Sequence, residues 1–281
     1  MQPAPSERAR FLHAVVGGWL LVVGSLGLLG CGSSPGASGG SASFGALDTI
    51  ETTEVPRDSV LAVLARMDRA AFDSAFARLD AYGVTRHERT ERLDTTGTTT
   101  AYRTLTLRYA PGSGPGTVQQ ADSAGPFRGG GLLSSLTPTA ERRARPANLA
   151  AEALDDPPAY LAPRTQEAYR YALRRDSLRD GTATYVVEAT AWNDERGDDQ
   201  SIRYARLTIA RPSYELVGLT TARTSQILLF RENSQTTLHL RRAPDGAWVP
   251  HQTRVRAVVD VPLRTPRQFR TVSTYYGYTT N

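Results

Sequence analysis

From residue 84 onward, apolar and polar side chains alternate along most of the chain. The stretch 248–261 alternates most regularly, with Val255, Ala257 and Val259 on one side and mostly polar residues on the other. Successive side chains of a strand point to opposite faces of a sheet, so a period of two predicts half-buried strands. Strands are predicted at 84–93, 98–109, 168–176, 184–192, 202–210, 215–224, 226–231, 236–242, 248–261 and 267–278.

The segment before these strands has a different period. Within 58–82, apolar residues such as Leu64, Phe72 and Phe76 recur at helical spacing, and Gly83 is a natural stop signal. The pattern predicts one amphipathic helix that packs on an apolar surface. Together the elements predict a β-rich α+β fold. In it, a strongly curved antiparallel sheet, an unclosed β-barrel, carries one to three helices against its concave side.

Turn-forming residues and changes of composition divide the rest of the chain. Asp245-Gly246 predicts a hairpin turn between two strands. Glycine and proline in 111–131 predict a flexible insertion, and 132–154 is expected to be helical in part. Residues 31–56 are rich in Ser, Gly, Ala and Thr and read as a flexible tether. The folded domain is therefore expected at 57–281.

The N-terminus carries a targeting pattern. Arg8 and Arg10 precede an apolar stretch that ends in Leu28-Leu29-Gly30-Cys31. This ending resembles the lipobox of bacterial lipoprotein signal peptides, in which the cysteine becomes the lipidated first residue. We expect residues 1–30 to be a signal peptide and Cys31 to carry fatty acyl chains such as palmitate. The alternative is an uncleaved transmembrane anchor.

The lipobox also predicts where the protein is found. A lipidated Cys31 would hold it on a membrane of the cell envelope. Gly32, where an aspartate would favour retention, resembles lipoproteins that move on to the outer membrane and face the periplasm. This inference assumes a cell with two membranes.

The amino-acid composition excludes several kinds of catalytic and binding site. Cys31 is the only cysteine, and all 33 basic residues are arginine, so Schiff-base and P-loop chemistry through lysine are ruled out. His87, His239 and His251 lack ligand spacing and are expected to be ordinary sheet residues. We expect no metal, no cofactor, no nucleic-acid partner and no catalytic residue, hence a non-enzyme. The net charge of +5 is a weak bias over 281 residues.

Residues 182–278 bear a resemblance to a known group. The strand at 204–209, the turn into 214–218 and the step Asp245-Gly246-Ala247-Trp248-Val249-Pro250 look like the LolA/LolB-like superfamily of lipoprotein carriers and receptors. The resemblance covers about the last hundred residues and the N-terminal helix. It implies an unclosed barrel lidded by helices, with a cavity that accepts acyl chains. The long insertion at 111–165 departs from that pattern, and no site residue is transferred.

Three functions follow as hypotheses. The first is a monomeric lipid-anchored protein whose cavity binds or transfers acyl chains of lipoproteins or lipids. The second is an envelope interaction or scaffold lipoprotein whose cavity is filled by its own helix, and the third is a hydrolase with a site assembled only in three dimensions. For the first, the expected cavity-lining residues are Leu105, Leu107, Val187, Leu207, Ile209, Val255 and Val259.

Overall fold

The computed structural model describes residues 56–112, 114–125, 158–192, 200–227, 230–260 and 265–280. These residues belong to one compact unit, Glu51–Asn281. Its ten strands are β1 (Gly83–Leu93), β2 (Thr99–Tyr109), β3 (Thr117–Ala124), β4 (Tyr169–Arg179), β5 (Thr182–Ala191), β6 (Gln200–Ala210), β7 (Leu216–Ile227), β8 (Phe230–Arg242), β9 (Trp248–Asp260) and β10 (Arg267–Thr279).

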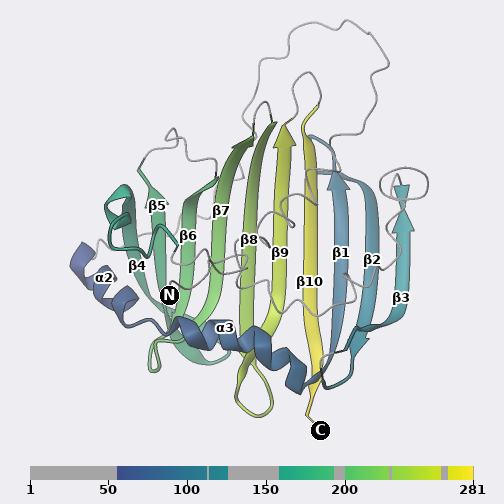
Figure 1. Ribbon diagram of the computed structural model, residues 1–281, viewed down its shortest axis with the longest axis horizontal. Helices are drawn as coiled ribbons and strands as arrows, with labels where there is room; N and C mark the ends of the chain where they lie inside the picture. Colours follow the sequence, from purple (N-terminus) through teal and green to yellow (C-terminus); the bar gives the residue numbers. More distant parts are fainter. Residues whose placement is uncertain are drawn as a thin grey trace, which may run out of the picture. The chain divides into compact units, whose positions relative to one another are not determined.

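All ten strands form one antiparallel sheet in the order β3-β2-β1-β10-β9-β8-β7-β6-β5-β4 (Figure 1). β4 to β10 follow one another in chain order, as a meander of hairpins. The one pairing between strands distant in sequence joins β1 to β10, for example at Arg86 and Tyr275. β3 and β4 are the two edges, so the sheet is unclosed, and the predicted β-rich α+β class is confirmed.

The strand register sorts the side chains onto two faces. Val187, Leu207, Leu219 and Leu238 lie directly opposite one another on four successive strands, and each is at most 2% exposed. We call the face that carries this row the helix-side face, and the opposite one the outer face. Because alternation is regular, the residues between them, such as Arg206, belong to the outer face.

Two short helices cover the helix-side face, where one long helix was predicted. α2 (Arg57–Ala65) contacts β4, and α3 (Arg69–Ala77) contacts β7 and β9, lying across one end of these strands in Figure 1. A short 3₁₀ turn, η1 (Arg78–Ala81), follows. The expectation of one helix over 58–82 is wrong at the link between α2 and α3.

Backbone pairing explains the break between the helices. The N–H of Asp68 donates to the carbonyl of Tyr214 at 2.8 Å, and the N–H of Leu216 donates to the carbonyl of Asp68 at 3.2 Å. Asp68 thus forms a bridge with the turn between β6 and β7 instead of continuing the helix. This long-range contact fixes where both helices sit on the sheet.

Two other strand predictions are corrected. The segment 117–124 was expected to be part of a flexible insertion, but it forms β3, which pairs with the open edge of β2. The predicted strands at 226–231 and 236–242 are not separate, because β8 runs unbroken from Phe230 to Arg242. In both places the backbone finds partners on a neighbouring strand that the local sequence does not reveal.

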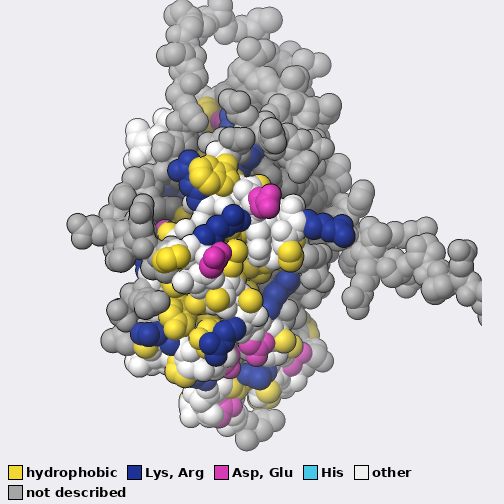
Figure 2. Space-filling view, turned by 90° about the vertical axis from the view of Figure 1, so that its left-hand side faces the viewer, with side chains coloured by type: hydrophobic (Ala, Val, Ile, Leu, Met, Phe, Trp, Pro, Cys, Tyr) yellow, Lys and Arg dark blue, Asp and Glu magenta, His cyan; other side chains and the backbone are white. Residues whose placement is uncertain are grey.

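The edge strand β4 contacts α2 through aromatic and cationic side chains. The guanidinium of Arg57 lies over the ring of Tyr171 at 5.8 Å, and the hydroxyl of Tyr171 donates to the carbonyl of Tyr160 at 2.7 Å. Seen from this side, hydrophobic side chains gather between arginine side chains (Figure 2).

Several predictions lie outside the described residues. They are the signal peptide, Cys31, the tether, the helical segment at 132–154 and most of the insertion at 111–165. Within the described ranges, no helix combines the length and apolar character needed to cross a bilayer.

Candidate functional site

The structure separates the seven predicted lining residues into two groups. All seven lie on the helix-side face by register. Five are at most 4% exposed and belong to the hydrophobic core that also contains residues of both helices: Leu105, Leu107, Val187, Leu207 and Ile209. Val255 and Val259 are only half-buried and lie outside that core, farther along β9.

The packed part of this face is built by α3 and η1. Phe72, Phe76 and Leu79 are each at most 2% exposed, and the two phenylalanine rings pack at 5.7 Å. The same end is held by a 2.5 Å hydrogen bond from the Tyr82 hydroxyl to Asp245 in the β8–β9 turn. This end of the sheet is therefore a closed core.

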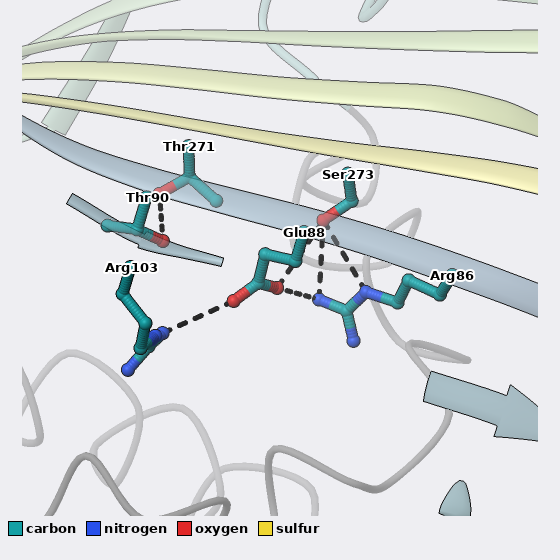
Figure 3. A network of polar contacts seen from close by, with 6 residues as sticks. All are labelled: Arg86, Glu88, Thr90, Arg103, Thr271 and Ser273. Carbon is teal, nitrogen blue, oxygen red and sulfur yellow. Dashed lines mark hydrogen bonds and ion pairs between the residues drawn. The ribbon is translucent and has the colours of Figure 1, made fainter. Parts of the chain in front are cut away.

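Farther along the same face lies a charged network (Figure 3). Glu88 on β1 is its centre, and it accepts hydrogen bonds from Arg86, from Arg103 on β2 at 3.3 Å and from Ser273 on β10 at 3.4 Å. The side chains of Arg86, Glu88 and Arg103 are each only 13% exposed. Beside them, the hydroxyls of Thr90 and Thr271 bond at 3.2 Å.

Two guanidinium groups around one carboxylate leave this network with a net positive charge. Burial disfavours the charge on Arg86, but the neighbouring Tyr275 and Glu88 outweigh burial and raise the pKa of Arg86 above its ordinary value. Arg86 therefore stays protonated. The network brings a buried cationic group and several hydrogen-bond donors to the face that also carries Val255 and Val259.

The network adjoins the half-buried valines. Val255 lies opposite Thr271, Thr271 lies opposite Thr90, and Thr90 lies opposite Arg103. These four residues form one row across four strands, with the apolar Val255 at one end and the cationic Arg103 at the other. Neighbouring strands are about 4.8 Å apart, so Val255 is roughly 14 Å from the Arg103 backbone. An elongated molecule with an apolar end and an anionic end matches this row.

Sequence reasoning missed Arg86, Glu88 and Arg103. One signal was available: from Thr85 to Arg92 no residue is apolar, so β1 cannot have one purely apolar face. The partners Arg103 and Ser273 come from other strands, and only the register brings them to Glu88.

The histidines form no shared ligand set. His87 bonds the hydroxyl of Thr106 at 3.1 Å, and His239 lies on the outer face over Gly218, where the missing side chain leaves it room. Burial, with the charges of Arg179 and Arg254 and the nearby His251, lowers the pKa of His239 to about 4. Over the described ranges, no three His, Cys, Asp or Glu residues come together as a metal site.

Comparison with known proteins gives structural likeness only. No protein-family model and no curated protein matches the chain. The crystal structure of the LolA superfamily protein NE2245 from Nitrosomonas europaea is similar at 14% identity and a TM-score of 0.27, with 81% of this chain and 94% of that chain covered. A DUF1329 family protein from Desulfovibrio piger is similar at 12% identity and a TM-score of 0.25, with the same coverage. At these TM-scores the likeness carries no argument about function.

Proposed function

We propose that the protein binds the acyl chain of a lipid or lipoprotein against the helix-side face of its sheet. The observation that carries the proposal is the row from half-buried Val255 to the Arg86–Glu88–Arg103 network. The acyl chain would lie along Val255, Ala257 and Val259. Each buried CH₂ group would contribute about 0.8 kcal/mol.

The charged network suits the polar end of such a ligand. Guanidinium groups donate paired hydrogen bonds to carboxylates and phosphates, and these bonds are strong where water is scarce. Glu88 neutralises only one of the two arginines around it. A fatty-acid carboxylate or a lipid phosphate would supply the second negative charge.

The proposal includes a lipid anchor. Acylation of Cys31 would hold the protein on a membrane of the envelope, and we propose the periplasmic face of the outer membrane. At about 0.8 kcal/mol per buried CH₂, two or three acyl chains would make release slow. Mass spectrometry of the protein from membranes tests this directly, because a Cys31→Ser chain would lack the acyl mass.

A second candidate function is an interaction or scaffold lipoprotein with a self-filled face. It is favoured by one observation, that five of the seven predicted lining residues are packed in the same hydrophobic core as the helices. Under this alternative the half-buried valines bind no ligand of their own.

Ligand binding separates the two candidates. The full chain carrying Cys31→Ser would be titrated with a dansyl-labelled undecanoate, and native mass spectrometry would detect co-purified lipid. Filling the site with Val255→Phe and Val259→Phe is expected to weaken probe binding at least tenfold, since the new rings occupy the ligand's place.

The matched control is Val186→Phe, because Val186 is also half-buried on a strand but lies on the outer face opposite Arg174. It should leave the affinity unchanged. Wild-type affinity in the Val255→Phe, Val259→Phe double variant would refute the acyl site. No probe binding and no co-purified lipid in the wild-type protein would favour the scaffold alternative.

A further inference from the structure

The outer face carries a second arginine cluster, on the other side of the sheet from the proposed acyl site. It surrounds an open pocket of about 440 Å³. The pocket is lined by His87, Arg89, Glu91, Arg254, Arg270, Val272 and Thr274.

The register explains why a pocket forms on a sheet surface. Val272 on β10 lies opposite Arg89 on β1 and opposite Arg254 on β9. Arg270, two residues before Val272, points to the same face. A short side chain in the middle of three long ones makes a hollow whose floor is apolar and whose rim carries guanidinium groups.

The charges at the rim do not balance. Glu91 bonds Arg89 at 2.8 Å and Arg270 at 2.5 Å, so both of its oxygens are engaged. Among the described residues, the guanidinium of Arg254 donates to the amide oxygen of Gln252 at 3.5 Å, and the residue is exposed. Three cations around one anion leave an excess positive charge, and Arg254 has no carboxylate partner among the described residues.

We propose that this pocket binds a phosphate group. Arginine forks match the oxygens of a phosphate, and Arg254 is free to turn toward an anion over Val272 while Arg270 approaches from the adjacent strand. The hydroxyl of Thr274 and the ring of His87 add hydrogen-bonding groups at the rim. The volume exceeds that of a bare phosphate and accommodates a phosphate ester.

The test is calorimetric titration of the full Cys31→Ser chain with two probes. One is inorganic phosphate, and the other is dihexanoyl phosphatidylglycerol below its micelle concentration. Arg254→Gln is expected to weaken binding about tenfold, the usual effect of losing a charged hydrogen-bond donor. Glu91→Gln is expected to tighten binding, because it removes the carboxylate that competes for Arg89 and Arg270.

Arg231→Gln is the matched control. Arg231 is exposed on the outer face of β8 outside the pocket, so its loss removes the same charge without touching the rim. Binding of the lipid probe alone would identify a lipid head group as the source, and binding of inorganic phosphate would identify a soluble ligand. Absence of binding with both probes, or equal loss in Arg231→Gln and Arg254→Gln, would overturn the proposal.

This inference is independent of the acyl site. The Val255→Phe, Val259→Phe double variant changes the helix-side face only and should leave phosphate binding intact. Arg254→Gln should likewise leave binding of the undecanoate probe intact, so failure of one proposal is distinguishable from failure of the other.

Discussion

Two clusters centred on carboxylates of β1 have the same composition and different surroundings. Glu88 with Arg86 and Arg103 lies on the helix-side face, and Glu91 with Arg89 and Arg270 lies on the outer face. Each has one carboxylate between two guanidinium groups. The arginine side chains are 13% exposed in the first cluster and 43% exposed in the second.

The difference shows how burial changes the role of the same three groups. On the helix-side face, removal from water makes each partner essential to the others, because an unpaired buried charge is costly. On the outer face, water solvates the charges of the exposed arginines. The same arrangement therefore contributes little to the free energy of unfolding and leaves its guanidinium groups accessible to a ligand. β1 thus contributes the carboxylate and one arginine of a network with buried arginines on one face and of a network with exposed arginines on the other.

The largest expected effect is the loss of the buried carboxylate. Glu88→Gln would leave Arg86 and Arg103, whose side chains are each only 13% exposed, without a counter-charge. We expect the free energy of unfolding to fall by about 3 kcal/mol, the lower end for breaking a buried ion pair. Urea unfolding of the full Cys31→Ser chain measures it. A loss below about 1 kcal/mol would mean that the network is solvated.

An intermediate effect is expected from His239, which shows that the outer face is not uniformly open to water. Its pKa is about 4 in the folded protein because burial and the nearby arginines oppose its charge, whereas the unfolded value is about 6.5. The unfolded chain therefore binds the proton more readily between these values. Stability should fall by on the order of 2 kcal/mol as the pH drops from 6.5 to 4, after allowance for partial exposure.

The matched variant for this pH effect is His239→Gln, which cannot titrate. Thermal unfolding at several pH values should show a smaller decline for the variant than for the parent chain. An identical decline in both would exclude His239 as its source.

The smallest effect is expected from Glu91, whose own side chain is only 8% exposed but whose two arginine partners are each 43% exposed. Hydrogen bonds from Arg89 and Arg270 outweigh burial and lower the pKa of Glu91. Its contribution to stability is therefore present above the unfolded pKa and is lost as the pH falls through the lower, folded value. At pH 7, Glu91→Gln should cost less than about 1 kcal/mol, because both arginines are well exposed.

Comparing Glu88→Gln with Glu91→Gln in the same urea experiment sharpens the contrast between the faces. Equal losses in the two variants would show that burial does not separate the clusters. A larger stability loss in Glu88→Gln than in Glu91→Gln that persists in high salt would support the role of burial, since salt screens exposed pairs more than buried ones.

Local patterns predicted much of the fold. Alternation along β9 places Val255, Ala257 and Val259 on one face and Arg254 and Arg256 on the other, and Asp245-Gly246 forms the expected turn, with Gly246 at a φ of +84°. These features depend on neighbouring residues in the chain, so the sequence reveals them.

The misses involve partners that lie outside the local segment. The break at Asp68 depends on Tyr214 and Leu216, and β3 depends on the open edge of β2. The Glu88 network needs Arg103 and Ser273, which only the register brings together. The seven expected lining residues share the helix-side face by register, and five of them are packed in the core while Val255 and Val259 are half-buried.

The central claim is that the helix-side face binds an acyl chain beside the Arg86–Glu88–Arg103 network. The most direct test is photo-crosslinking of the full Cys31→Ser chain with a diazirine-bearing fatty acid, mapped to single residues by mass spectrometry. We expect crosslinks at Val255, Ala257 and Val259. Crosslinks confined to the intervening outer-face residues, or none above the level of the Val255→Phe, Val259→Phe double variant, would contradict the claim.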